Sequence, residues 1–169
     1  GLVFNVTSTQ TLIKKSLLSD LDIDCITLEY PEYIRKEMKR SKYQEEIDFL
    51  LSNTKRNKFI CKLCNSIQGN TLVLFQYVEK HGKPLLKLME HECNGKDVFF
   101  VYGGTDTEVR EKIRQVIEEK SNAIILASYG TFSTGISIKR LHNIVFSSPS
   151  KSRVRVLQSI GRQLRKSKY

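Results

Sequence analysis

Short apolar runs alternate with amphipathic stretches through the second half of the chain. Four runs have the length and composition of buried strands, at residues 71–76 (TLVLFQ), 98–102 (VFFVY), 123–128 (AIILAS) and 144–147 (IVFS). Helical spacing of apolar residues begins at Pro84, follows an N-cap at Asp106 or Thr107, and runs from about Val154 to Arg165. Strands that alternate with helices predict an α/β domain with a parallel sheet and helices on both faces.

The first 70 residues carry less regular patterns. Ser8 or Thr9 suits the N-cap of a helix whose apolar face is Leu12, Leu17 and Leu18. Alternating apolar positions predict a strand over Asp22–Tyr30, and Pro31 then opens a charged helical region. Helical spacing continues at Tyr43, Ile47, Leu50, Leu51, Ile60, Leu63, Cys64 and Ile67.

Two predicted helices have faces that can be assigned from spacing. The helix after residue 106 is expected to turn Val109, Ile113, Val116 and Ile117 inward. On the last helix, Leu157, Ile160 and Leu164 form the predicted core face, and Gln158, Arg162 and Arg165, with Arg155 beside them, form the other. A solvated basic face explains arginines, but not three arginines with a glutamine and no glutamate. Guanidinium groups bind phosphate in a bidentate manner, so this face predicts an anion partner.

The charge of the chain is positive and uneven. Lys and Arg number 28 against 18 Asp and Glu, which gives a net charge of +10, and the pI is about 9.5. Seven of these basic residues lie between Lys151 and Tyr169, where there is no acidic residue. A basic surface can serve solubility alone, but the clustering favours a polyanionic partner, nucleic acid first.

Small, polar or glycine-rich loops follow the predicted strands. They are Gln76-Tyr77, Gly103-Gly104, residues 128–135 (SYGTFSTG) and residues 147–149 (SSP). Ligands of parallel α/β sheets bind at the carboxyl ends of the strands, and glycine allows backbone to approach a phosphate closely. Glycine loops alone are weak evidence for a site.

Motifs in the second half resemble those of superfamily 2 helicases. QSIGRQLR (158–165) resembles motif VI, whose pattern is Gln-x-x-Gly-Arg-x-x-Arg. TLVLFQ resembles the strand of motif IV, VYGGTDTEVREKIRQVIE the glycine turn and helix after it, and AIILASYGTFSTGISIKRLHNIVFSSP motif V with its next strand. The motifs occur in the family's order over residues 70–169. Their amino-acid sequences most resemble those of recombination helicases.

The resemblance implies the fold and division of the chain. We expect a RecA-like three-layer α/β domain, the second motor domain of a helicase, over residues 22–169 with its motif-bearing core at 70–169. Residues 1–21 would connect it to a preceding motor domain, and a chain that begins with Gly1 suggests a piece of a longer protein.

The resemblance also implies roles for individual residues. In catalysis, Arg165 would be the arginine finger on the γ-phosphate, Arg162 its neighbour, and Gln158 a group that positions water or phosphate. Gly135, Ser137 and Gly161 would lie at the nucleotide, although the family usually has Asp where Ser137 stands, which puts a carboxylate role there in doubt. The predicted nucleic-acid contacts are Gln76, Tyr77, Gly103, Gly104, Ser128, Thr131 and Thr134.

The phosphate-binding half of a motor is missing from this sequence. Gly82-Lys83 is followed by Pro84 and Gly95-Lys96 by Asp97, so no G-x-x-x-x-G-K-[ST] loop exists, and no Asp-Glu box exists. ATP and Mg²⁺ would be bound mainly by the preceding motor domain, and this chain alone is expected not to hydrolyse ATP. The resemblance implies an ATP-dependent helicase or translocase that remodels branched DNA such as D-loops, R-loops and Holliday junctions. The alternative is a basic nucleic-acid-binding module without a motor role.

Cysteines and histidines give weaker signals. Cys61 and Cys64 have metal-ligand spacing, which His91 and Cys93 could complete, but Cys64 lies on an apolar helical stripe where a buried thiol is the usual occupant. The three histidines form no constellation with Ser or Asp that suggests catalysis. Four cysteines without a secretory signal, and no apolar run of membrane-spanning length, favour a reduced cytoplasmic setting without a membrane partner.

Overall fold

A parallel β-sheet forms the centre of the molecule. The computed structural model describes residues 7–134, 138 and 140–163. Within them the sheet has the strand order β2-β3-β1-β4, and every neighbouring pair is parallel. Thr71 is opposite both Ile124 and Asn143, so the strands start nearly level. The strands are β1 (Thr71–Phe75), β2 (Val98–Val101), β3 (Ile124–Ser128) and β4 (Asn143–Phe146).

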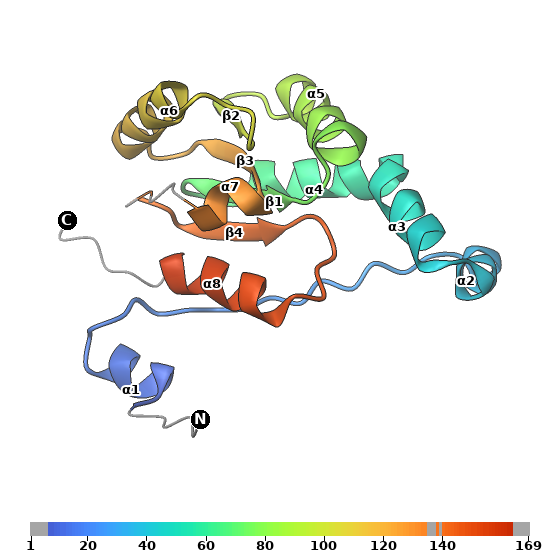
Figure 1. Ribbon diagram of the computed structural model, residues 1–169, viewed down its shortest axis with the longest axis horizontal. Helices are drawn as coiled ribbons and strands as arrows, with labels where there is room; N and C mark the ends of the chain where they lie inside the picture. The colour runs from blue at the N-terminus through green and yellow to red at the C-terminus, as the bar shows by residue number, and fades with distance from the viewer. Residues whose placement is uncertain (1–6, 135–137, 139, 164–169) are drawn as a thin grey trace.

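Helices precede, separate and follow the strands (Figure 1). The described helices are α1 (Thr9–Lys14), α2 (Glu32–Arg40), α3 (Tyr43–Ser52), α4 (Thr54–Ser66), the π-helical turn η1 (Val78–Gly82), α5 (Lys83–Glu92), α6 (Thr107–Glu119), α7 (Tyr129–Thr134) and α8 (Arg153–Gln163). Ser8 caps α1 by accepting from the Thr11 amide, and Asp106 caps α6 by accepting from the Glu108 amide. The predicted starts at Ser8, Pro31, Pro84 and Asp106 are therefore confirmed to within a residue or two.

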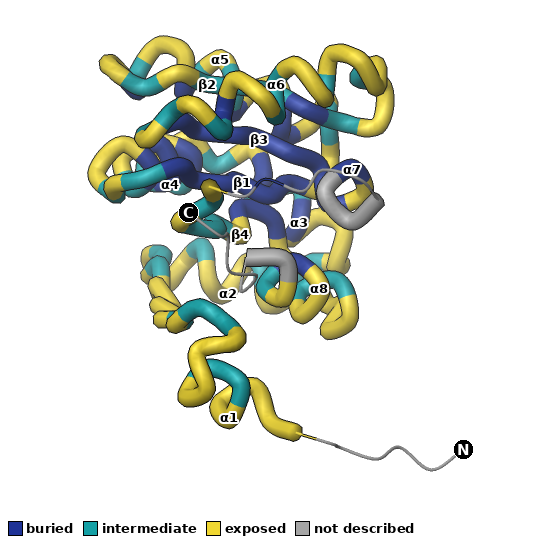
Figure 2. Tube along the Cα trace, turned by 90° about the vertical axis from the view of Figure 1, so that its left-hand side faces the viewer, coloured by how far each residue is buried: buried dark blue, intermediate teal, exposed yellow. Residues whose placement is uncertain are grey.

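The sheet is covered on both faces. On one side α4 and α5 pack on alternate residues of β1 and β3, among them Val73, Phe75 and Leu126. On the other side Ile117 of α6 packs on Leu72 and Leu74. Every residue of β1 and β3 is buried, which Figure 2 shows as dark blue tube. Burial on both faces explains why these strands are continuous apolar runs rather than alternating ones, and the predicted three-layer α/β arrangement is confirmed.

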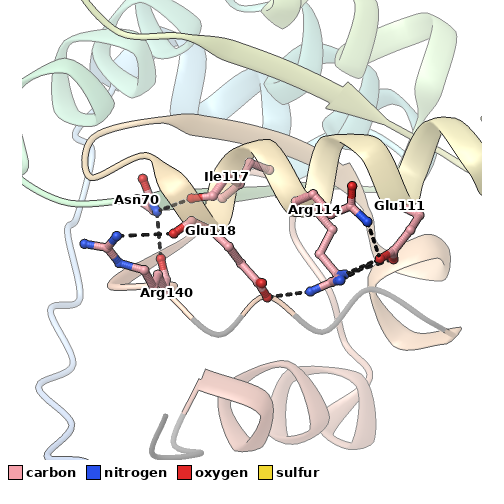
Figure 3. A network of polar contacts seen from close by, with 7 residues as sticks. Asn70, Glu111, Arg114, Ile117, Glu118 and Arg140 are labelled. Carbon is pink, nitrogen blue, oxygen red and sulfur yellow. Dashed lines mark hydrogen bonds and ion pairs between the residues drawn. The ribbon is translucent and has the colours of Figure 1, made fainter. Parts of the chain in front are cut away.

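A fully buried asparagine ties together the amino ends of the strands. Asn70 donates from Nδ2 to the carbonyls of Ile117, Lys120 and Arg140 at 3.2, 2.8 and 2.8 Å. Its Oδ1 accepts from the Ala123 amide at 2.9 Å. Figure 3 shows this hub beside the end of α6. Buried polar groups need such partners, so Asn70 fixes the position of α6 against the sheet.

The strand predicted over Asp22–Tyr30 is wrong. This segment is described without strand pairing, and Ile23 and Ile26 are 66% and 52% exposed. Residues 20–24, 26 and 28 line a hollow of about 540 Å³ together with residues of β4. Alternating apolar residues form a strand only where a neighbouring strand takes their backbone hydrogen bonds, and β4 is not paired with this segment.

Some predicted helix faces also differ from the structure. The α1 helix ends at Lys14, Ser16 has a φ of 56°, and Leu17 is 61% exposed, so the face of Leu12, Leu17 and Leu18 does not form. On α6, Ile117 is buried and Ile113 packs against the core, but Val109 and Val116 are 45% and 42% exposed. The sheet therefore covers only the Ile113 and Ile117 side of α6 and leaves Val109 and Val116 partly exposed.

Candidate functional site

The loops at the carboxyl ends of β1 and β4 meet and are held together by Ser148. The Ser148 hydroxyl oxygen accepts from the Gln76 amide at 3.1 Å and lies 3.0 Å from Nδ1 of His81. The Ser148 carbonyl accepts from the Tyr129 hydroxyl at 2.9 Å. Thus the ends of β1, β3 and β4 and the turn η1 share one buried residue, and the edge that the sequence predicted as a ligand site has a fixed geometry.

His81 lies beneath this edge and is fully buried. Its Nε2 is 3.3 Å from Oδ1 of Asn57, on α4. Burial, and then the positive charge of Arg56, lower the pKa of His81 from 6.5 to about 4. The imidazole is therefore neutral at physiological pH and acts as a structural bridge. His81 is one of the three histidines for which the sequence predicted no role, because a lone histidine before a helix carries no spacing signal.

Arg56 reaches the same edge from α4. One nitrogen of its guanidinium, Nη2, donates to the Ser147 carbonyl at 2.6 Å. Burial lowers the pKa of Arg56, and Nη1 has no hydrogen-bond partner among the described residues. The contact joins the carboxyl end of β4 to α4 on one face of the sheet. Tyr129, which packs on the other face, holds Ser148 of the same loop.

The α8 helix starts beside these loops, and one of its arginines points into them. Arg155 donates from Nη1 to Oε1 of Gln76 at 2.6 Å, and its guanidinium carbon lies 5.4 Å from the centre of the Tyr129 ring. Burial raises the pKa of Tyr129 to about 12, although Arg155 opposes the shift. Arg155 was predicted to flank the exposed stripe of α8. Instead it is half-buried and links two strand ends.

The predicted core face of α8 is partly wrong. Leu157 is 54% exposed, whereas Ser159 is only 4% exposed and donates to the Arg155 carbonyl at 2.9 Å. The helix packs on α7 and β4 rather than squarely on the sheet, which rotates its buried side toward Arg155 and Ser159. Gln158 is exposed as predicted. Gly161 is also exposed, and a Cβ added there would meet no described atom within 4 Å. This side of α8 is open to another surface.

The predicted nucleic-acid residues differ in accessibility. Gln76, Tyr77, Gly103 and Gly104 are exposed. Arg110 of α6 donates to the carbonyls of Gly103 and Thr105, at 3.2 and 2.7 Å, and so holds the glycine loop after β2. This arginine has a structural contact that sequence analysis did not assign.

The loop after β3 contains a helix that the sequence did not predict. Ser128 and Thr131 are buried, and their hydroxyl oxygens are 2.8 Å apart. Thr134 ends α7. The remaining residues predicted at the nucleotide, Gly135, Ser137 and Arg165, lie outside the described residues, as does Leu164 of the predicted core face. Arg162 belongs to the described backbone of α8.

Cys61, Cys64 and Cys93 are buried in the core between the sheet and α4 and α5. Burial raises the pKa of both Cys61 and Cys64 to about 12, which disfavours the thiolate form that ligates metal. Among the described residues no group of three or more His, Cys, Asp or Glu side chains could hold a metal ion. None of the described helices is both long enough and apolar enough to span a membrane.

Comparison with known proteins gives consistent matches. Residues 54–167 match the helicase conserved C-terminal domain. The chain is 40% identical over 169 residues to the ATP-dependent DNA helicase UvsW of Enterobacteria phage T4, a match that covers 98% of this chain and 33% of UvsW. The chain thus spans about a third of the length of that relative.

Solved structures agree with the sequence match. The crystal structure of T4 UvsW superposes with a TM-score of 0.70 at 40% identity, over 82% of this chain and 28% of that one. The C-terminal part of the Fun30 ATPase domain superposes with a TM-score of 0.56 at 17% identity, over 79% and 49%, which supports the fold alone. The expected RecA-like fold and the resemblance to superfamily 2 helicases, UvsW in particular, are confirmed. The chain belongs to the helicase conserved C-terminal domain family.

Proposed function

We propose that this chain is the second motor domain of an ATP-dependent DNA helicase or translocase that remodels branched DNA. The observation that carries the proposal is its 40% identity, over 98% of its length, to an ATP-dependent DNA helicase. Its partners would be DNA, ATP and a first motor domain, and its setting the cytoplasm of a host cell. D-loops, R-loops and Holliday junctions are the proposed substrates, in recombination, repair and replication restart.

The nucleotide role rests on α8. Gln158 and Gly161 lie on its exposed side, so this helix can form one wall of a cleft closed by another domain. We assign Arg165 as the arginine finger, Arg162 as its neighbour and Gln158 as the group that positions water or phosphate. We also assign Gly135, Ser137 and Gly161 to nucleotide binding. ATP and Mg²⁺ would be held mainly by the first motor domain, where Mg²⁺ supplies charge neutralisation on the phosphates.

The DNA role rests on the loops at the carboxyl edge. The exposed Gln76, Tyr77, Gly103 and Gly104 are available to a DNA backbone without rearrangement. Ser128, Thr131 and Thr134 belong to the same proposed surface, but the hydroxyls of Ser128 and Thr131 are buried and would reach DNA only if α7 moved. Backbone contacts of this kind carry no sequence information, so binding should be general.

The test compares this chain alone with a motor completed by a first domain that carries a phosphate-binding loop. We expect no ATP hydrolysis by the chain alone and DNA-stimulated hydrolysis by the complete motor. We also expect oligonucleotide affinity to fall steeply between about 50 and 200 mM salt, because counterion release drives such binding. Salt-sensitive DNA binding without any ATPase in the completed motor would favour the alternative of a non-motor binding module. Robust turnover by the chain alone would contradict the proposal.

A further inference from the structure

Arg155 connects the α8 helix to the loop after β1 and to α7, at the carboxyl edge of the sheet. It belongs to α8, its Nη1 donates to Gln76 Oε1 at 2.6 Å, and its guanidinium lies over the Tyr129 ring of α7. On its own helix, the Arg155 carbonyl accepts from Ser159, which is buried. A half-buried side chain held by contacts on both sides has few accessible rotamers. A displacement of Gln76 should therefore shift Arg155 and, with it, α8.

The contact also determines which way the Gln76 side chain is turned. A glutamine amide has one oxygen that accepts and one nitrogen that donates two hydrogen bonds. Arginine has only donors, so it can bind Gln76 through Oε1 alone. With Oε1 bound to Arg155, the two N–H donors of the exposed Gln76 have no partner among the described residues and are available to a ligand. Such donors suit an anion such as a DNA phosphate.

The backbone beneath Gln76 is equally fixed. Its amide donates to Ser148 Oγ at 3.1 Å, and Ser148 is held in turn by Tyr129. Thus Gln76 and Tyr129, the two groups that Arg155 contacts, are already joined through one buried serine. Arg155 adds a side-chain hydrogen bond from this cluster to α8, whereas the Ser159 hydroxyl binds within its own helix.

We propose that Arg155 is a positioning residue that orients the Gln76 amide as a phosphate donor and couples DNA at this loop to the α8 helix. The inference rests on the proposed function, and it assigns a role to a residue outside the Gln-x-x-Gly-Arg-x-x-Arg pattern. Lysine cannot replace it, because a single ammonium cannot both donate to the amide oxygen and keep the contact that the guanidinium makes with the tyrosine ring.

The experiment uses the 169-residue chain, with a fluorescein-labelled oligothymidine and amide hydrogen exchange with and without that oligonucleotide. In the wild type we expect DNA to slow exchange both at residues 76–77 and along α8. In Arg155→Ala we expect roughly tenfold weaker binding, about the loss of one charge-assisted hydrogen bond, and slowing of exchange at the loop but not along α8 at saturating DNA. Arg155→Lys should resemble Arg155→Ala, and it tests the proposal even if the alanine variant is poorly folded.

Two further variants separate orientation from charge and folding. Arg153→Ala removes the same charge from an exposed position on the same helix, so it should bind somewhat less tightly and retain slowed exchange along α8. Gln76→Met keeps the length of the side chain and adds no charge but has no N–H donor, so it should bind DNA poorly while its melting temperature changes little.

The outcomes are distinguishable. If the wild type does not bind the oligonucleotide even at low salt, the DNA-binding part of the proposed function fails, and this inference with it. If the wild type binds and Arg155→Ala behaves like Arg153→Ala in affinity and exchange, the inference is overturned and the proposed function stands.

Discussion

At the scale of single residues, the carboxyl edge of the sheet is organised by buried polar groups that the sequence does not advertise. His81 belongs to η1 and Ser148 to the loop after β4, and each is at most 3% exposed. A buried histidine is stable in its neutral form, because an imidazolium ion there would lose its hydration and face Arg56. The cluster thus holds the loops of the proposed DNA surface at the expense of tolerance to acid.

This burial predicts an acid-dependent loss of stability. The native pKa of His81, about 4, lies below its ordinary value of 6.5, so the native state binds fewer protons than the unfolded state. The contribution of His81 is fully present above about pH 6.5 and is lost as the pH falls toward 4. We expect about 2 kcal/mol less stability at pH 5 than at pH 7 from this residue. Urea unfolding at the two pH values measures it.

His81→Gln is the matched control for that measurement, because it keeps hydrogen-bonding capacity without a titrating group. Its pH dependence between 7 and 5 should be shallower than that of the wild type by about the same 2 kcal/mol. Equal pH dependence of the two proteins would mean that His81 is protonated in the native state or that its burial is not maintained in solution.

At the scale of elements, sequence patterns predicted the strands, because strands buried on both faces have a clear apolar signal. They did not predict the short helix α7 or the buried side of α8, which depend on contacts between elements. The central strands β1 and β3 were predicted because a strand between two helical layers is buried at every position and therefore mostly apolar. The edge strands β2 and β4 were predicted from shorter apolar runs. The α7 helix was missed because its sequence, YGTFST, has the composition of a loop, and its burial comes from β3 and α8. The faces of α8 were misassigned because spacing alone cannot show that the helix packs against α7 and β4.

Two helical glycines differ in the space around them: Gly82 is packed closely against a buried ring, and Gly161 has no described atom near it. A Cβ at Gly82, where η1 meets α5, would lie 2.6 Å from Cε2 of Phe75, a fully buried ring stacked on Phe100. We expect Gly82→Ala to destabilise the chain by about 1–3 kcal/mol, since the ring cannot move aside. Gly161→Ala is the control: it lies on the open side of α8, so the chain should be unchanged or up to about 1 kcal/mol more stable. Urea midpoints of both variants measure this, and an equal loss in both would contradict it.

At the scale of the whole molecule, the exposed side of α8 and the loops at the carboxyl edge of the sheet are the two surfaces that we propose to bind a first motor domain and DNA. The fold could be predicted from the chain's own pattern. The anion-binding face on the last helix is a prediction from the same pattern, and assays of its function would test it. The particular roles of Arg165, Arg162 and Gln158 came from the resemblance to helicases, because helical geometry cannot distinguish a γ-phosphate from any other anion. The link from Arg155 to Gln76 could not be predicted, because residues 79 positions apart share no sequence pattern.

Arg165 provides the sharpest test of the motor assignment. A finger that acts on transition-state charge lowers kcat with little effect on ground-state binding. In the motor completed by a first domain, we therefore expect Arg165→Ala to keep its melting temperature and DNA affinity and to lose roughly 10³-fold or more in DNA-stimulated ATP hydrolysis. Arg165→Lys should recover little, because an ammonium cannot reproduce the planar fork of guanidinium. Arg153→Ala, at the exposed start of α8, is the control for charge and should retain most turnover. Steady-state ATPase with saturating DNA decides the matter: near wild-type turnover in Arg165→Ala would move the finger to Arg162, and a collapsed melting curve would make Arg165 structural.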